Sequence, residues 1–546
     1  MNRLVVRTLS KERLRITINL PSKAKNFERS SDEAFGGFVK RLKSKLPGEV
    51  KTVAIINSSG SFIKDNVELC DAFISSNKFV LNEVCYDISV DPPTIEELMI
   101  SNTPVAGLVL APKVKVINIA ITNLMYKWET KATDGNWEEI SSAGVLLLYP
   151  KLMGKLVRLC CFGPGVEPVF SNVIGPVIDD VFTNSLLSRA ISMEYGFTRI
   201  MSYNILADAF MESRTDPIRN FYPYCPKKFQ MRKYREPRIV AEVWAHKPHI
   251  ICMQEVEDKT FSNCLLPMLE KYHGHITVIK GRFKAGCAMF FKADDFEECH
   301  YESFPLPDLY RESFGIEDLH KLGQKISSKF PDIWKDIGIR PVMTQIAVLR
   351  HKESEKLLIV GNTHLFWNPV YHVIALLHIH AMCTKIQGVK DVYEKQGERV
   401  SVVICGDMNS QIGSLVHFYL TDGTVLQYQK NKGELFDFLK ENVRNPIKLQ
   451  LARGEPNYTN YTADFKDVID YVLCDENSTV GQVTPSPHLS DLEKSEGCPS
   501  AIFPSDHLPI ISDVLLGGRK NDFPYSGISS NSADFQIPVH TCRCYC

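Results

Sequence analysis

"VVICGDMNSQ" (residues 402–411) contains an apolar run that is followed by two oxygen-bearing side chains. Residues 402–405 have the composition of a buried strand, and Gly406 separates them from Asp407 and Asn409. Taken alone, this strand end is most simply a turn, since Asp and Asn side chains bind the backbone groups of turns. The alternative is a functional site, and the remaining sequence decides between the two.

Five other apolar runs carry a similar polar side chain. From residue 198 to residue 517, strand-like runs alternate with helix-length segments, which predicts a layered α/β domain. The polar residues at these runs are Asn204, Glu255, His364, Asp470 and the pair Asp506 and His507. Because ligands gather at strand ends in layered α/β folds, the whole set favours a functional site over a turn.

The residue types at these strand ends predict the chemistry. Carboxylate and amide oxygens are the ligands that Mg²⁺ and Mn²⁺ prefer, and such ions keep positions open for a phosphate. His364 and His507 beside such a cation could stabilise a charged phosphoryl transition state. A carboxylate next to the metal could orient and deprotonate the attacking water. The sequence therefore predicts metal-dependent hydrolysis of a phosphoester.

The composition excludes several classes of protein. No apolar run approaches the ~20 residues of a membrane span, so we expect no membrane partner. A net charge of −1 argues against a histone-like coat for polyanions, although a cleft could still bind nucleic acid locally. The 16 cysteines include no CxxC pair, which argues against a structural zinc site. A chain of this size needs no disulfides, so we expect a reducing compartment.

The N-terminal part has a different pattern of apolar runs and turn residues. Over residues 1–170, short β-branched runs alternate with turn signals such as Asp134-Gly135, which predicts a β-sandwich-like domain. Residues 171–197 are predicted to form a linker, 198–517 the α/β domain, and the polar residues 518–546 a disordered tail.

Motifs in the α/β region resemble those of the endonuclease/exonuclease/phosphatase superfamily. They occur in family order as SYNIL, QEV, GCAMFF, NTHLFW, GDMNS, VIDYVL and PSDH. YPYCP (222–226) and EPNYTNY (455–461) are similar to the branch that holds mRNA deadenylases and 2′,5′-phosphodiesterases. The resemblance implies a four-layer α/β sandwich. It also implies Mg²⁺-dependent release of 5′-AMP from 2′,5′-linked oligoadenylate or from 3′,5′-linked poly(A) tails, with Mn²⁺ as a possible substitute.

The resemblance also assigns roles to the polar residues. The metal and phosphate site comprises Glu255, Asn204, Asp407, Asn409 and His507. Glu255 is the principal metal ligand, and Asp407 is also the general base. His364 stabilises the pentavalent phosphorane, while Asp470 and Asp506 hold the catalytic groups in orientation.

Two local features bear on single-stranded RNA or oligoadenylate as the partner. Residues 227–238 contain six basic residues and one acidic residue, and they either contact phosphates or form an exposed basic helix face. The candidate contacts are Lys227, Lys228, Arg232, Lys233 and Arg235. Phe366 and Trp367 either stack on an adenine or pack in the core.

Three departures from the family pattern keep other functions open. Asn368 stands where relatives have His, and Ala375 and His378 replace a basic residue and a Gln in the following segment. The alternatives are a same-fold phosphoesterase with another substrate, or a catalytically weak RNA-binding or scaffold homologue. The resemblance suggests the mitochondrial matrix, whereas the lack of a convincing presequence leaves the cytoplasm as the alternative.

Overall fold

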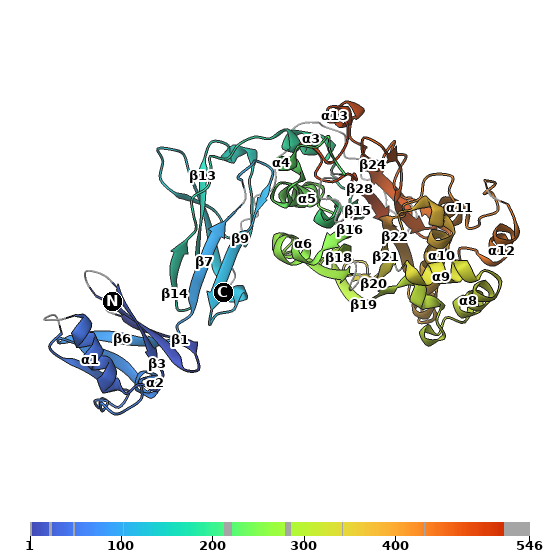
Figure 1. Ribbon diagram of the computed structural model, residues 1–546. Helices are drawn as coiled ribbons and strands as arrows, with labels where there is room; N and C mark the ends of the chain where they lie inside the picture. The colour runs from blue at the N-terminus through green and yellow to red at the C-terminus, as the bar shows by residue number, and fades with distance from the viewer. Residues whose placement is uncertain are drawn as a thin grey trace. The chain divides into compact units, whose positions relative to one another are not determined.

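The computed structural model describes residues 3–20, 24–46, 50–101, 103–211, 221–278, 285–340, 342–430 and 432–517 (Figure 1). The chain divides into two compact units, Met1–Asn184 and Ser185–Cys546. In the described ranges, no helix has the length and apolar character needed to cross a membrane. The predicted tail, 518–546, lies outside the described residues.

The first unit begins with one mixed sheet and two helices. The strands are β1 (Arg3–Ser10), β2 (Arg13–Asn19), β3 (Ala24–Ser30), β4 (Val53–Asn57), β5 (Ser76–Leu81) and β6 (Val84–Val90), in the order β3-β2-β1-β6-β5-β4. Helices α1 (Phe35–Lys45) and α2 (Leu69–Ile74) bury Phe38 and Phe73 in the same core as the sheet residue Phe79. The prediction of a β-sandwich-like domain is therefore wrong for this part, in which helices pack on a single sheet.

The rest of the first unit is built from strands around Trp128. They are β7 (Thr94–Ile100), β8 (Val109–Leu110), β9 (Pro112–Ile117), β10 (Met125–Lys131), β11 (Glu138–Ser141), β12 (Leu146–Leu147), β13 (Leu156–Gly163) and β14 (Val166–Phe170). β10 and β11 form the hairpin expected at Asp134-Gly135. Trp128 is fully buried, and its Nε1 donates to Ala143 O over 2.9 Å. Helix α3 (Val181–Arg189) lies inside the predicted linker, which is thus partly helical.

The second unit has the predicted helix–sheet–sheet–helix layering. The first sheet contains β17 (Tyr272–Val278), β18 (Ala285–Lys292), β16 (Ile250–Glu257), β15 (Thr198–Asn204), β28 (Ile510–Leu515) and β27 (Thr479–Val483), in this order. The second contains β19 (Phe296–Pro305), β20 (Met343–His351), β21 (Leu357–His364), β22 (Val400–Asp407), β26 (Asp470–Asp475) and β23 (Leu449–Leu451). A two-stranded ribbon pairs β24 (Asn460–Tyr461) with β25 (Lys466–Asp467).

Helices cover both outer faces of the paired sheets. They include α5 (Arg232–His246), α8 (Glu317–Lys329), α9 (Pro331–Ile339), α10 (His372–Lys395), α11 (Leu415–Asp422) and α12 (Glu434–Asn442). The short helices α4 (Lys227–Gln230) and α13 (Leu489–Glu493) pack against loop residues instead. Figure 1 shows α5 on one side of the two sheets and α10 on the other. The predicted four-layer α/β sandwich is therefore the architecture of this unit.

β22, the strand of the opening motif, is buried on both faces. Val403 and Cys405 point into the core between the two sheets, whereas Val402 and Ile404 belong to the core between sheet and helices. This division follows from the alternation of side chains along a strand, and it explains the continuous apolar run. At Gly406, φ is +156° and a Cβ would lie 2.1 Å from Thr363 O, so only glycine allows β21 to approach here.

The last strand, β28, occupies an interior position in the first sheet. It pairs antiparallel with both β15 and β27. Across the β15 pairing, the Arg199 guanidinium binds Asp513 through two hydrogen bonds of 2.6 and 2.8 Å, and both side chains are buried. Removing one partner of a buried ion pair typically costs about 3–5 kcal/mol. This pair therefore stabilises the pairing of β28 with β15, the first strand of the unit.

Candidate active site

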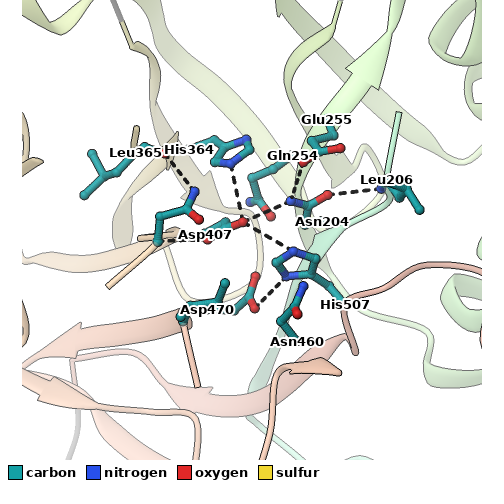
Figure 2. A network of polar contacts seen from close by, with 12 residues as sticks. Asn204, Leu206, Gln254, Glu255, His364, Leu365, Asp407, Asn460, Asp470 and His507 are labelled. Carbon is teal, nitrogen blue, oxygen red and sulfur yellow. Dashed lines mark hydrogen bonds and ion pairs between the residues drawn. The ribbon is translucent and has the colours of Figure 1, made fainter. Parts of the chain in front are cut away.

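Strand pairing brings the predicted polar residues together at the ends of neighbouring strands in the two sheets. Asn204 ends β15 and lies beside Gln254 of β16, one residue before Glu255. In the second sheet, His364 ends β21 opposite Asp407, the last residue of β22, and Asp470 begins β26 opposite Asp407. His507 lies just before β28 of the first sheet. Figure 2 shows these side chains facing one another across the two sheets.

Asn204 links the carboxylates of the two sheets. Its Nδ2 donates to Glu255 Oε1 over 3.1 Å and to Asp407 Oδ2 over 3.0 Å. Its Oδ1 accepts from the backbone N–H of Leu206 over 3.0 Å, which fixes the orientation of the amide. Asn204 is fully buried, so this bridge is protected from water.

Glu255 sits on a strained backbone. Its φ is +58°, and the pairing of β16 with β18 shifts register between Met253 and Val256. A non-glycine residue in this region costs about 1–3 kcal/mol, and such strain clusters at functional sites. Burial raises the pKa of Glu255, His364 opposes this shift, and Asp506 adds to it. Its Oε2 accepts from Ala207 N over 2.9 Å.

His507 lies between two carboxylates. Its Nδ1 is 2.8 Å from Asp470 Oδ2, and its Nε2 is 3.5 Å from Asp407 Oδ2. Burial opposes protonation, but Asp470, Asp407 and Asp506 together raise the pKa of His507 well above its usual value. Burial also raises the pKa of Asp470, a shift that His507 opposes and Asp407 reinforces. Asp470 thereby holds the imidazole with Nε2 facing Asp407.

His364 and Asn409 complete the surroundings of Asp407. His364 Nε2 lies 3.4 Å from Asp407 Oδ2, and the His364 side chain is one quarter exposed. The backbone N–H of Asn409 donates to Asp407 Oδ1 over 2.9 Å, and its Nδ2 donates to Leu365 O over 2.9 Å. Asn409 also has a positive φ of +46°. Asp407 and Asn409 are therefore part of one polar site, as the opening motif predicted.

Asp506 binds the side chains of Tyr222 and Asn460. Its Oδ2 accepts from the Tyr222 hydroxyl over 2.8 Å and lies 3.5 Å from Asn460 Nδ2. The contact that orients a catalytic histidine comes from Asp470, whereas Asp506 orients Tyr222. Neither Tyr222 nor Asn460 was predicted as a site residue, although they lie in the motifs YPYCP and EPNYTNY. A buried tyrosine hydroxyl needs a partner, and this requirement is the signal that could have identified Tyr222.

The donor set suits a divalent cation. Asp407, Asp470 and His507 can each offer one ligand atom, and these atoms lie within 4.8 Å of one another. Among the described residues, Asp470 Oδ1 is buried without a hydrogen-bond partner. Glu255 adds a further, half-buried carboxylate, and desolvation raises its pKa. Several buried carboxylates gathered around one point are costly unless a cation neutralises them, so these residues fit a bound divalent metal ion.

The structure separates the basic residues 227–238 into two groups. Lys227, Lys228 and Lys233 are exposed, whereas Arg232 is half-buried and pairs with Asp208 over 2.9 Å. Arg235 is buried and donates to the carbonyl groups of Ile205, Leu206 and Pro504, and to Asp208. The prediction that Arg235 contacts RNA is therefore wrong, because its guanidinium holds the loop after β15.

The two aromatic candidates also differ. Phe366 is half-buried against the core between the second sheet and its helices, which matches the core-packing alternative. Trp367 is 67% exposed, with its ring centre 6.1 Å from that of Phe366. Trp367 is thus the aromatic residue on this segment with a face open to a ligand.

The three departures from the family pattern lie outside the polar site. Asn368 caps the short helix η7 (Pro369–Tyr371), and its Oδ1 accepts from Val370 N over 3.0 Å. Ala375 and His378 are buried in α10, and burial lowers the pKa of His378 to about 4. These residues therefore affect a loop cap and the core, and they leave the carboxylates and histidines of the site in place.

Comparisons with known proteins relate the chain to a group of hydrolases. The sequence model described as "Endonuclease/Exonuclease/phosphatase family" matches residues 201–507. The 2′,5′-phosphodiesterase 12 of Mus musculus is 27% identical, over 83% of this chain and 78% of the relative. The CCR4-Not complex 3′-5′-exoribonuclease subunit Ccr4 of Candida albicans is 29% identical, over 59% of this chain and 42% of the relative. The crystal structure of ANGEL2, a 2′,3′-cyclic phosphatase, is 20% identical with a TM-score of 0.48, and covers 59% of this chain and 98% of that chain.

Proposed function

Because the chain belongs to the endonuclease/exonuclease/phosphatase family, we propose that this phosphodiesterase is a Mg²⁺-dependent exoribonuclease. It removes 5′-AMP units from the ends of 2′,5′-linked oligoadenylate, 3′,5′-linked poly(A), or both. The observation that carries the proposal is the Asn204 bridge, which holds the carboxylates of Glu255 and Asp407 from two different sheets beside two histidines.

Glu255, Asp407 and Asn409 are the residues that would hold the metal ion, whereas His507, whose Nδ1 faces Asp470 and whose pKa the surrounding carboxylates raise, remains a hydrogen-bond donor. Their oxygen-rich set favours Mg²⁺, with Mn²⁺ as a substitute. When bound, the cation supplies Lewis-acid stabilisation of the charge on the phosphate.

The chain's own groups then perform the remaining steps around Asp407. Asp407 Oδ2, with imidazole nitrogens 3.4 and 3.5 Å away, is placed to orient an attacking water and accept its proton. His364 and His507 provide N–H donors for the phosphate oxygens on which negative charge develops. The water oxygen bonds to phosphorus as the bond to the neighbouring ribose oxygen breaks, which releases 5′-AMP and a shortened chain.

The substrate class is supported by two kinds of observation. One relative is named a 2′,5′-phosphodiesterase and another a 3′-5′-exoribonuclease, so both linkages are candidates for this chain. Trp367 offers an exposed aromatic face, and Lys227, Lys228 and Lys233 offer exposed positive charge. Aromatic faces and basic side chains are the usual means of binding single-stranded nucleic acid.

Cleavage of two matched oligoadenylates tests the proposal. We expect the purified full chain to release 5′-AMP from at least one of the 2′,5′-linked and 3′,5′-linked tetramers in Mg²⁺, and to stop in EDTA. Chromatographic separation of the products would give both rates and hence the linkage preference. A folded, Mg²⁺-supplied protein that cleaves neither tetramer would contradict the proposed substrate class.

The exposed indole predicts a separate effect on substrate binding. Trp367→Ala should raise KM for an oligoadenylate by about 10-fold or more, because stacking of one base contributes about 1–3 kcal/mol. Since Trp367 does not touch the carboxylates, kcat should change less than KM. Steady-state kinetics on the preferred linkage measures both values.

Two variants control this prediction. Trp367→Tyr keeps an aromatic ring and should restore most of the affinity, and Val370→Ala changes a side chain that is 75% exposed on the same segment. If the alanine variants at 367 and 370 gave equal KM values, stacking on Trp367 would have no role.

A further inference from the structure

A second cluster of metal-ligating side chains lies on edge strands of the α/β unit. β17 is the edge strand of the first sheet and carries His273 and His275, while β19 is the edge strand of the second and carries Glu298. Residues two apart on a strand point to the same face, so both imidazoles project from the same side of β17. The cluster therefore joins the two sheets at their shared edge.

The three side chains converge on one carboxylate oxygen. Glu298 Oε2 is 2.5 Å from His275 Nε2 and 4.0 Å from His273 Nε2, and the two imidazole centres are 4.8 Å apart. One ligand atom from each residue lies within 4.8 Å of the others. Tetrahedral zinc, with bonds of about 2.0–2.2 Å, places ligand atoms about 3.3 Å apart. Small side-chain movements would therefore bring all three atoms to bonding distance of one ion.

Neighbouring side chains hold the imidazoles in place. The His275 ring stacks on Tyr301 at 3.7 Å with an interplanar angle of 8°. The Tyr301 hydroxyl in turn lies 3.0 Å from Thr277 Oγ1 and accepts from Gln345 Nε2 over 2.9 Å. The His273 ring centre lies 5.2 Å from that of Phe291. Support of this kind orients the ligands of metal sites.

This cluster is separate from the candidate active site. His273 pairs with Phe291 of β18, which pairs with Ile250 at the start of β16. Glu255 lies five residues further along β16, a distance of about 17 Å at the usual rise of a strand. The two sites also lie on strands separated by β18. An ion at the edge cluster would thus be too far away to take part in hydrolysis.

We propose that His273, His275 and Glu298 bind a divalent transition-metal ion, best fitted by Zn²⁺, which connects the two sheets at their edge strands β17 and β19. Imidazole and carboxylate ligands suit this ion, whereas Mg²⁺ prefers oxygen alone. His273 is about half exposed, so the ion has access from solvent and water can fill the fourth position. The absence of CxxC pairs counts only against a cysteine-bound zinc ion and does not bear on histidine and carboxylate ligands.

Binding at this site stabilises the folded protein. The ion contacts both sheets in the native state, and the unfolded chain does not hold the three ligands together. A ligand that binds the native state in preference to the unfolded state raises the melting temperature in a concentration-dependent way. The bound ion would also hold β17 and β19, the edge strands of the two sheets, to one another.

Zinc binding by the full chain and by a His273→Asn variant tests the proposal. After chelation and dialysis, both proteins receive saturating Mg²⁺ and then equal Zn²⁺, and gel-filtered samples are analysed for zinc. We expect the unaltered chain to retain about one more zinc ion per molecule than the variant. Zinc should raise the melting temperature of the unaltered chain more than that of the variant. Any zinc taken up at the active site is common to both proteins and cancels in the comparison.

Two more variants make the result decisive. His300→Asn removes a histidine of β19 that faces Glu302 rather than the cluster, and it should behave like the unaltered chain. Glu298→Gln keeps the side-chain shape and should lose the extra zinc. All four proteins should hydrolyse substrate equally in Mg²⁺. Equal zinc content in the unaltered chain, His273→Asn and Glu298→Gln would overturn the proposal.

Discussion

Replacing Glu255 by glutamine should lower kcat by about 10³-fold or more, which corresponds to about 4 kcal/mol of lost transition-state stabilisation. The substitution keeps the size of the side chain but removes the carboxylate charge of the proposed principal metal ligand. It also removes one of the two acceptors that Glu255 offers to Asn204 Nδ2 and Ala207 N, because a glutamine nitrogen cannot accept a hydrogen bond. Single-turnover hydrolysis in saturating Mg²⁺ measures the loss.

The stability of the same variant should change in the opposite sense. Burial raises the pKa of Glu255, so its ionised form is less favourable in the folded protein than in the unfolded chain when no cation is bound. This penalty is present above the unfolded pKa, and glutamine removes it at neutral pH. Glu255→Gln in EDTA should therefore melt at or above the temperature of the unaltered chain, which separates lost chemistry from unfolding.

A matched control strengthens the comparison. Glu270→Gln neutralises an exposed carboxylate that lies outside the polar site. This variant should hydrolyse substrate at the normal rate. A Glu255→Gln enzyme within 10-fold of the unaltered rate would show that this carboxylate is not the principal ligand.

The second large effect is expected at the Asp470 and His507 pair. Asp470→Asn should lower kcat by about 10²–10⁴-fold, because His507 loses the carboxylate that orients its Nδ1 over 2.8 Å and favours its charged form. His507→Asn should cost at least as much, since it removes the N–H donor itself. Rates are measured on the preferred linkage at saturating substrate and Mg²⁺.

The double variant tests whether the two residues act as a unit. If Asp470 acts through His507, the combined loss should be close to that of His507→Asn alone, because groups that work together are not additive. Multiplication of the two single losses would instead indicate that Asp470 has an independent role, such as holding the metal. Melting temperatures of the three variants exclude a common loss of fold.

The polar site was largely predictable because it depends on local strand ends. Asp407 ends the apolar strand β22, and Asn409 follows it in the loop, where its backbone N–H donates to Asp407 Oδ1. The strained backbone of Glu255 was not predictable, since it arises from a bulge opposite β18, whose residues lie 30 positions further along the chain. Likewise, the sequence predicts that Arg235 is a solvent-exposed cation. In the structure it donates instead to carbonyl groups of two loops that are distant in the sequence.

The fold was predictable in its layers and less so in its details. Strands buried on both faces, such as β22, are recognisable by a continuous apolar run. Helix α1 contains Gly36-Gly37, which lowers its helix propensity, so the sequence does not predict a helix there. The pairing of β15 with β28 joins segments about 300 residues apart, and no local pattern encodes such a partnership. Long-range pairings and buried polar networks therefore had to come from the structure.

The interior position of β28 has a consequence for how the enzyme is made. Until a ribosome has synthesised residues 510–515, β15 lacks one of its two neighbouring strands and β27 has no strand to pair with. His507, just before β28, is then not yet attached to the sheet. A nascent chain can fold its first unit early, since domains fold as units during synthesis. Its hydrolytic site therefore cannot assemble until residues 510–515 have left the ribosome, so a shorter nascent chain has no complete site for hydrolysis.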